Sequence, residues 1–305
     1  MSCINNDVSV VITSYNQGEM VREAVDSVLA QTILPVEIVV VDDGSTDADS
    51  TTVLETLERE AARGTLPCQL RVLRQENAGP SAARNAGIRE ARTPYVAALD
   101  GDDQLLPTFL EKTAAELSHD STVVAASGWL QTFGVLESVV QPTGGALVDF
   151  LSHNCCPATC CIRRSAWEAC GGYDESMRSG FEDWDFSLSL LETSDDARIS
   201  VLPEPLVQYR TAPASSNITS MDKRLDLMRY LIEKHRDSYA AHLAEAMTGI
   251  ETISMKRLAL WEHAAKDCPE LLNISPSSAD FMAHPTYGDG GMAAAVRIRS
   301  FLNAR

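Results

Sequence analysis

Apolar and polar positions alternate with two different periods through the first 120 residues. A β-branched run at residues 8–13 stops at a polar loop and predicts a buried strand. Residues 20–30 repeat their apolar side chains at helical spacing, so we expect a helix with one buried face. Residues 37–41 show the strand pattern again, and apolar residues between 53 and 57 mark a second helix. This β-α-β-α order predicts parallel strands, because each helix carries the chain back across the sheet.

The same alternation continues toward residue 120, with strands expected at 70–73 and 95–99 and helices at 81–91 and 107–117. Polar side chains recur where these strands end. In open parallel sheets the carboxyl ends of the strands form the edge at which ligands bind. We therefore expect a ligand site at this edge, in an α/β fold whose mixed, mostly parallel sheet is flanked by helices.

The pattern changes after residue 120. Short strands are predicted at 123–126 and 139–140 and a helix at 182–191, and beyond residue 213 the chain has helical spacing. One helix there places four apolar residues on a single face, namely Leu225, Met228, Leu231 and Ile232.

We divide the chain near residue 215 into a first domain, residues 1–215, and a helical C-terminal extension, residues 216–305. The first domain has two halves, residues 1–120 and 121–215. With 305 residues and 45% hydrophobic content, the chain is long enough to bury one large core and a smaller appendage.

Charge and hydropathy argue against two classes of protein. The net charge of -18 argues against a general affinity for nucleic acid, because clustered Lys and Arg bind a phosphate backbone. No window reaches the roughly 20 apolar residues that span a bilayer. The first residues lack the basic segment of a signal peptide. We expect a cytoplasmic protein, with any contact to the inner face of the membrane being peripheral.

Four of the eight cysteines cluster in the segment Cys155-Cys156-Pro157-Ala158-Thr159-Cys160-Cys161. Structural zinc sites usually show separated pairs of cysteines or nearby histidines, and this spacing fits them poorly. We expect these cysteines to be buried as small apolar side chains, in keeping with a reducing compartment.

Three carboxylates, Asp100, Asp102 and Asp103, follow the strand at 95–99. They repel one another unless a cation holds them, and Mg²⁺ or Mn²⁺ prefers oxygen ligands and bridges carboxylate to phosphate. Gly101 would let a diphosphate approach the backbone. The alternative is an acidic turn that caps the next helix, and the apolar strand in front favours the metal site.

A second acidic pair, Asp42 and Asp43, follows the strand at 37–41. A carboxylate there can accept a hydrogen bond from the uracil imide or from a ribose hydroxyl. Residues 45–47 are good helix N-caps, and the capping and binding roles are compatible.

Two helix starts carry further candidates. The segment at 76–85 brings Arg84 into the first turns of a helix, where helix N-termini attract phosphate. Its small residues are equally typical of close helix packing. Glu182 and Asp183 open the helix at 182–191, and one of them could accept a proton from a hydroxyl. Alternatively, they stabilise the positive end of that helix.

Taken in order, six segments resemble the family 2 glycosyltransferases over about residues 7–215: SVVITSYNQ, EIVVVDDGSTD, ENAGPSAARNAGI, YVAALDGDD, ACGGYDE and GFEDWDF. The resemblance implies a GT-A (Rossmann-like) fold, with a nucleotide-binding half at 1–120 and an acceptor-binding half at 121–215. It implies an inverting hexosyltransferase that uses a nucleotide diphosphate sugar, often a UDP-sugar, with Mn²⁺ or Mg²⁺. The acceptor would be a carbohydrate or glycoconjugate in cell-surface polysaccharide synthesis.

Carried over by position, the resemblance also implies roles for single residues. Asp100 and Asp102 match the D-x-D motif, with Asp102 the direct metal ligand. Asp183 matches the general base and Glu182 its partner. The loop at 171–175 would lie near the donor sugar and acceptor. The nucleotide would be contacted by Thr13, Ser14, Tyr15, Asp42 or Asp43, Asn77, Gly79, Arg84 and Asp100.

One departure from the family pattern concerns the metal. Many relatives carry a His two residues after a Tyr-Arg pair, where it assists the metal or diphosphate, but this chain has Ala212 there. Arg210, Ser215 or Ser216 could contact the diphosphate instead. Two alternatives stay open: a sugar nucleotidyltransferase, and a nucleotide-sugar-binding module without catalysis.

Overall fold

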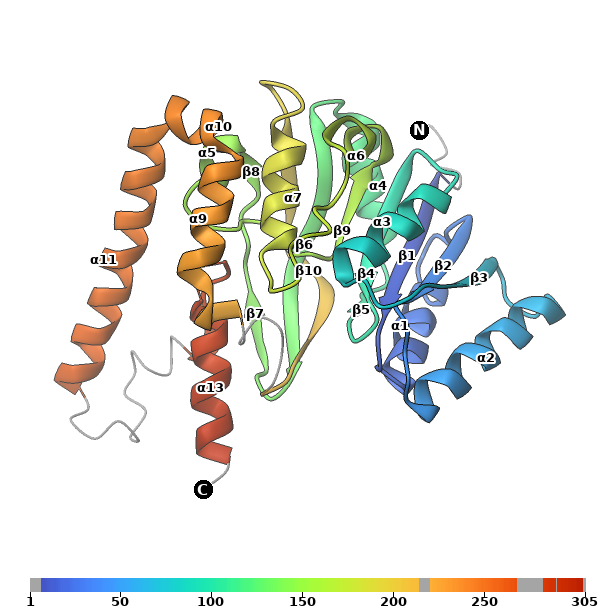
Figure 1. The fold of residues 1–305 in the computed structure, drawn as a ribbon. Helices are drawn as coiled ribbons and strands as arrows, with labels where there is room; N and C mark the ends of the chain where they lie inside the picture. Colours follow the sequence, from blue (N-terminus) through green and yellow to red (C-terminus); the bar gives the residue numbers. More distant parts are fainter. Residues whose placement is uncertain (1–6, 214–219, 268–281, 289, 304–305) are drawn as a thin grey trace.

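The computed structural model of the chain describes residues 7–213, 220–267, 282–288 and 290–303. One sheet runs through the molecule with helices on both of its faces, and the C-terminal helices lie at one end (Figure 1). Within the described residues the sheet has ten strands, in the order β3-β2-β1-β4-β9-β6-β10-β5, with β7 paired to β6 and β8 to β10.

The first four strands form the parallel half that the sequence predicts. They are β1 (Val8–Ser14), β2 (Glu37–Asp42), β3 (Gln69–Arg74) and β4 (Tyr95–Asp100), and they pair with one another in parallel. Ser14 lies opposite Asp42, and Thr13 lies opposite Asp100. The polar residues that end these strands therefore share one edge of the sheet, as expected.

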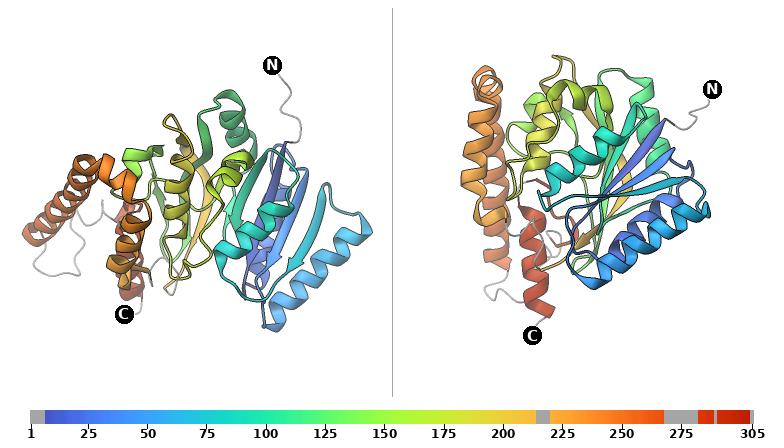
Figure 2. Two further views of the ribbon diagram at one scale, coloured as in Figure 1. Left: turned by 45° about the horizontal axis from the view of Figure 1, so that its top comes forward. Right: turned by 45° about the vertical axis from the view of Figure 1, so that its right-hand side comes forward.

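Helices bury an apolar core on each face of the sheet (Figure 2). One face is covered by α1 (Glu19–Leu29), α2 (Ala48–Arg63) and α4 (Phe109–His119), and the other by α3 (Pro80–Glu90), α6 (Arg164–Cys170) and α7 (Glu182–Leu191). Alternate side chains of a strand point to opposite faces. Accordingly, Val10 and Ile12 of β1 join the first core, and Val11 joins the second.

The second half contains strands that the sequence pattern did not reveal. β6 (Val123–Gly134) runs well past its predicted end at residue 126, and β10 (Arg198–Thr211), where no strand was predicted, pairs with it in parallel. Two prolines lie in β10, and the register shifts around Pro205 because proline cannot donate to the ladder. The remaining short elements are β5 (Gln104–Leu105), β7 (Ser138–Val140), β8 (Gly145–Ala146), α5 (Leu147–Phe150) and β9 (Cys160–Arg163).

The described chain beyond residue 220 is helical, as predicted, and contains α9 (Arg224–Lys234), α10 (Arg236–Ala241), α11 (Leu243–Asp267) and α13 (Gly291–Asn303). The predicted apolar face of α9 is wrong, because Leu231 is buried whereas Leu225 is 81% exposed and Ile232 is 40% exposed. α11 lies outermost (Figure 1). None of the described helices is long and apolar enough to cross a bilayer.

Candidate active site

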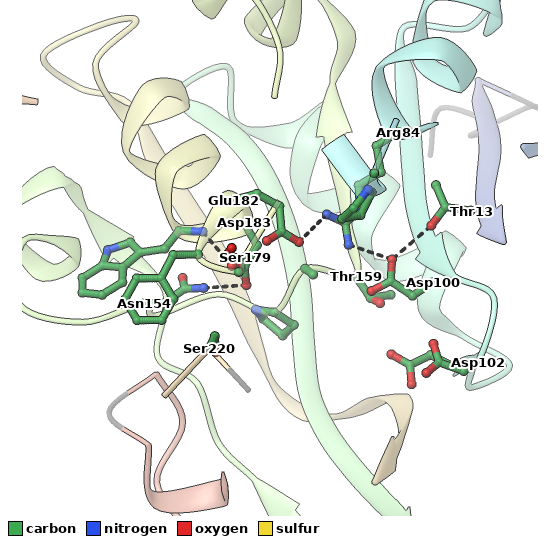
Figure 3. A pocket seen from close by; sticks show the side chains of 18 of the residues that line it. Thr13, Arg84, Asp100, Asp102, Asn154, Thr159, Ser179, Glu182, Asp183 and Ser220 are labelled. Carbon is green, nitrogen blue, oxygen red and sulfur yellow. Dashed lines mark hydrogen bonds and ion pairs between the residues drawn. The ribbon is translucent and has the colours of Figure 1, made fainter. Parts of the chain in front are cut away.

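A cavity of about 680 Å³ opens at the carboxyl ends of β1 and β4, against the start of α7. In Figure 3, Glu182 and Asp183 lie between two groups of side chains. Thr13, Asp100 and Asp102 lie on one side of them, and Asn154 and Ser220 lie on the other. The predicted site residues that line the cavity are Thr13, Ser14, Tyr15, Asp43, Asn77, Gly79, Arg84, Asp100, Asp102, Glu182 and Asp183.

Asp43 joins the loop after β2 to the loop after β3. Its Oδ1 accepts hydrogen bonds from the Gln75 side chain at 2.7 Å and from the Ala78 backbone N–H at 2.8 Å. Its Oδ2 accepts one from the Gly79 backbone N–H at 2.8 Å. Asp42 is not among the residues that line the cavity, and its Oδ1 accepts the N–H of Ser45 at 3.0 Å. Of the two candidates, Asp43 is the one that borders the cavity.

The loop after β1 borders the same side of the cavity. The Thr13 hydroxyl donates to Asp100 Oδ1 at 3.2 Å, and Tyr15 is 48% exposed. The Ser14 hydroxyl is buried and has no hydrogen-bond partner among the described residues. Leaving a buried hydroxyl unpaired costs about 1–3 kcal/mol, so a bound ligand that pairs with it would remove this cost.

The acidic turn after β4 gathers three carboxylates, one of which, Asp100, pairs with Arg84 at 2.7 Å. Burial, and then the charge of Asp100, raise the pKa of Asp102 to about 6, and burial raises the pKa of Asp103 well above its usual value. Asp103 accepts the N–H of Arg210 at 2.8 Å, whereas Arg210 reaches Asp102 only at its backbone carbonyl oxygen, at 2.9 Å. A hard divalent cation fits Asp102, because its charge would oppose the effects that raise this pKa.

The metal-ligand set is incomplete in the protein alone. Across the described ranges, no three acidic, histidine or cysteine side chains converge closely enough to hold a metal. Mg²⁺ commonly completes its ligands with substrate phosphate and water, so a diphosphate would supply the rest. Gly101, which we expected to admit a diphosphate, is packed against β1 instead. A Cβ at Gly101 would lie 2.7 Å from the Thr13 carbonyl oxygen, so close packing explains this glycine.

Arg84 connects the two sides of the cavity. Its guanidinium is 4% exposed and donates to Asp100 Oδ1 at 2.7 Å and to Glu182 Oε1 at 3.0 Å. Although burial opposes it, the charges of Asp100 and Glu182 raise the pKa of Arg84 well above its usual value. We expected this arginine to attract phosphate, but two carboxylates already share its charge. In this structure Arg84 bridges α3 and α7.

Asp183 lies in the first turn of α7, two residues after Phe181, whose φ of 67° is uncommon for a non-glycine residue. Its Oδ2 accepts a hydrogen bond from Asn154 Nδ2 at 2.8 Å, and its Oδ1 accepts the Trp184 N–H at 2.9 Å. Burial, and then the charge of Glu182, raise the pKa of Asp183 to about 7. A carboxylate with this pKa can accept a proton near neutral pH, as a general base must.

A family model matches the first part of the chain. The model described as "Glycosyl transferase family 2" matches residues 9–168, just over half of the chain. The chain belongs to this family. The resemblance predicted from the sequence is thereby confirmed. The matched segment ends before Glu182 and Asp183, so the roles of these two residues in this family 2 member rest on the resemblance and the geometry.

Known proteins similar to this family 2 chain include two bacterial glycosyltransferases. EpsJ of Bacillus subtilis is 28% identical over 225 residues, which cover 68% of this chain and 62% of EpsJ. YibD of Escherichia coli is 37% identical over 120 residues, which cover 39% of this chain and 33% of YibD. The chain thus spans less than two thirds of the length of either relative.

Among solved structures, S. aureus TarS 1–349 in complex with UDP-GlcNAc is similar to this chain, at 19% sequence identity and a TM-score of 0.60. The match covers 98% of this chain and 91% of that one. At this identity the likeness shows the fold. The predicted fold, a mixed sheet flanked by helices with a helical C-terminal region, is confirmed.

Sequence reasoning missed two parts of this family 2 site. Asn154, which holds Asp183, follows no pattern that marks it. Tyr287 and Gly288 also line the cavity, from a segment of the C-terminal region whose sequence predicted nothing specific. A Cβ at Gly288 would overlap the Asn154 carbonyl group, so this segment packs directly on the residue that orients Asp183. The cavity therefore crosses the boundary that we placed near residue 215.

Arg210 supports the acidic turn from outside the cavity. Its Nε donates to the Asp102 carbonyl oxygen at 2.9 Å, and its guanidinium pairs with Glu23. Arg210 is not among the residues that line the cavity, and its contact with a diphosphate stays a prediction. Ala212 is exposed, and Ser215 and Ser216 lie outside the described residues.

The four clustered cysteines are buried, as expected for small apolar side chains. Burial raises the pKa of Cys155 to about 12. Because the thiolate is the reactive form, this thiol is inert near neutral pH.

A buried ionic network attaches α9 to α7. His235 donates from Nε2 to Asp185 Oδ1 at 3.0 Å and from Nδ1 to Glu192 at 2.9 Å. Lys234 donates to Asp185 Oδ2 and to Asp174, both at 2.8 Å. Burial opposes the protonated imidazole, but the two carboxylates prevail and raise the pKa of His235 to about 9. His235 is therefore cationic at neutral pH and holds α9 against α7.

Proposed function

We propose that this protein is a metal-dependent inverting glycosyltransferase that moves a sugar from a UDP-sugar to an acceptor hydroxyl. The acceptor would be a carbohydrate or glycoconjugate in the synthesis of a cell-surface polysaccharide. The observation that carries the proposal is that Asp102 and Asp183 line one cavity, with Asp183 hydrogen-bonded by Asn154 at 2.8 Å. TarS, which shares the fold, was solved with UDP-GlcNAc, so this donor is the first to test.

In the proposed reaction, Asp183 takes the proton of the acceptor hydroxyl as the hydroxyl oxygen bonds to the anomeric carbon. The bond between that carbon and the diphosphate oxygen breaks, and the nucleoside diphosphate leaves with the electron pair. A single displacement of this kind inverts the anomeric configuration. Asn154 orients the base, and Arg84 fixes Glu182 beside it.

Asp102, with Asp100 beside it, would hold Mn²⁺ or Mg²⁺. The bound ion would offset the negative charge that develops on the leaving diphosphate. Arg84 does not offer this charge, because Asp100 and Glu182 share it.

On the nucleotide side, Asp43 would accept the uracil imide N–H. An ionised carboxylate has about four acceptor positions, and the loop at 75–79 occupies three of those on Asp43. One position remains for a ligand. The unpaired Ser14 hydroxyl and the Asn77 side chain border the same space.

Calorimetric titration of UDP into the protein, with Mn²⁺ and then with EDTA, tests the donor half of the proposal. GDP serves as the control. We expect binding that is selective for UDP and that weakens when the metal is removed. Purified protein should then release UDP from one member of a panel of UDP-sugars, starting with UDP-GlcNAc, when acceptors are added.

Two outcomes would replace the proposal. UDP binding without transfer or hydrolysis of any donor in the panel would indicate a binding module without catalysis. Release of pyrophosphate from UTP and a sugar phosphate would indicate a nucleotidyltransferase.

A further inference from the structure

The charges that line the cavity are separated along its length. Six carboxylates line it, namely Asp43, Asp100, Asp102, Asp103, Glu182 and Asp183. The first four of them come from residues 43–103. Arg84 is paired with two of these carboxylates. The other cationic residues among the described lining residues are Arg178, Lys223 and Arg224, which we call the cationic rim. Such a group is notable in a chain with a net charge of -18.

The cationic rim is fixed around the start of α7. Lys223 Nζ donates to Ser179 Oγ at 3.0 Å. The Arg224 guanidinium carbon lies 5.3 Å from the centre of the Phe181 ring and 6.0 Å from that of the Trp184 ring. Phe181 and Trp184 flank Glu182 and Asp183 in the sequence. Lys223 and Arg224 are thus anchored to residues on both sides of the proposed base.

Ser179, to which Lys223 donates, lies away from the acidic turn that would hold the donor diphosphate. Figure 3 places Ser179 and Ser220 close to Asp183 and far from Asp102. Lys223 and Arg224 are the N-cap and the first residue of α9, so the positive end of this helix dipole lies at the cavity wall. Arg178 extends furthest toward the nucleotide side, where a Cβ on Gly79 would lie 3.4 Å from its Cγ.

We propose that the acceptor carries a phosphate group close to the reacting hydroxyl, and that the cationic rim binds this phosphate beside Asp183. The inference rests on the proposed function and adds the chemical class of the acceptor. Three cations fit a phosphate, whose charge exceeds that of one carboxylate, and the planar guanidinium of arginine matches phosphate oxygens.

Binding of glycerol 3-phosphate, measured by calorimetry with UDP and Mg²⁺ at saturation, tests the inference, because UDP then fills the donor site. We expect the double variant K223Q/R224Q to bind glycerol 3-phosphate about tenfold more weakly or worse, while its UDP affinity stays at the wild-type value. Arg229→Gln is the matched control, since this arginine is exposed on α9 and pairs with Asp226 outside the cavity lining. The single variant Arg178→Gln should weaken binding too, and its exposed side chain makes misfolding a poor explanation.

Equal affinity of the wild type and both rim variants for glycerol 3-phosphate would overturn the inference. A loss of UDP affinity as large as the loss of glycerol 3-phosphate affinity would assign the rim to the donor instead. Equally tight binding of glucuronate would replace phosphate by carboxylate. If the wild type failed to bind UDP, the proposed function would fail, but rim-dependent binding of glycerol 3-phosphate would still establish an anion site.

Discussion

The carboxylates on the two sides of the cavity are held in opposite ways. Asp43, on the nucleotide side, accepts three hydrogen bonds from the loop at residues 75–79. The negative charges of Asp102 and Asp183 are less well compensated, because burial and then a neighbouring carboxylate raise the pKa of both. Asp43 therefore completes a structural contact, whereas the other two keep reactivity toward a cation and a proton. Perturbed groups of this kind are typical of catalytic positions.

The largest effect is expected on kcat, from replacing Asp183. Asp183→Asn keeps the shape of the side chain but cannot take up a proton, so kcat should fall by about 10²- to 10⁴-fold. The affinity for UDP should not change. In the wild type, kcat/KM, which reports the pKa of the free protein, should rise with pH up to about 7, where Asp183 ionises, and level off above it. Initial rates of UDP release measure both effects, and a variant with near wild-type kcat would exclude Asp183 as the base.

The next largest effect is expected on stability, from removing Arg84, which bridges Asp100 and Glu182. Arg84→Met leaves Asp100 and Glu182 without their buried partner, and such a loss typically costs about 3–5 kcal/mol of unfolding free energy. Urea unfolding measures the loss. Arg89→Met, on the same helix and with a side chain that is 58% exposed, is the control. Equal losses in the two variants would show that Arg84 is no more important than a surface ion pair.

Two aspartate variants should separate the metal from the nucleotide contact. Asp102→Asn should lower the Mn²⁺-dependent part of the UDP affinity by at least about tenfold, because it removes the proposed ligand charge. The affinity measured in EDTA should stay the same. Asp43→Asn should weaken UDP binding with and without metal, because the loop at 75–79 loses its anchor. Calorimetry in both buffers distinguishes them, and an Asp102→Asn protein with full metal dependence would contradict the ligand assignment.

The attachment of α9 should show a characteristic pH dependence. The pKa of His235 is raised to about 9 from 6.5, so its contribution to stability is complete below pH 6.5 and is lost as pH rises through 9. Relative to His235→Gln, the wild type should lose up to about 3 kcal/mol across this window. Urea unfolding at pH 6, 7.5 and 9.5 tests it. His242→Gln is the control, and a constant difference across the window would rule out the ion pairs as the cause.

The smallest effect concerns the thermal stability that the protein loses by ionising the buried Asp183. Ionising Asp183 in the folded protein is unfavourable between its ordinary pKa near 3.8 and its raised pKa near 7, and this cost is complete above pH 7. Asp183→Asn should therefore raise Tm at pH 8 by at least about 2 °C. Asp195→Asn makes the same change at an exposed position and should leave Tm unchanged. A lower Tm for Asp183→Asn would mean that hydrogen bonding outweighs the cost of the charge.

The fold of the nucleotide half could be predicted from the sequence because each strand and the polar residues at its end are neighbours in the chain. Each strand there is a short apolar run that ends in its own polar residues, as Val39 to Asp43 shows. Parallel pairing then brings the ends together without further information. The six quoted segments, taken in order, predicted the family and also marked Glu182 and Asp183 as site residues.

The other side of the cavity depends on contacts between distant residues, which no local pattern contains. Asn154 gains its role only because α7 brings Asp183 to it, 29 residues later in the chain. β10 was hidden by its prolines, and its pairing with β6 joins segments about seventy-five residues apart. Arg84 matched a binding motif, but its two carboxylate partners could be seen only once α3 and α7 were in place.

The packing of Gly288 on Asn154 sets an order of events during synthesis. The strands of the sheet and Asp183 precede residue 213, but one wall of the cavity waits for Tyr287 and Gly288, about seventy-five residues later. At about 5–20 residues per second, that interval lasts several seconds. During it the nascent chain carries a proposed base next to open solvent, where water competes with any acceptor for the donor sugar. Late completion of this wall would confine the proposed transfer to chains in which Tyr287 and Gly288 are already in place.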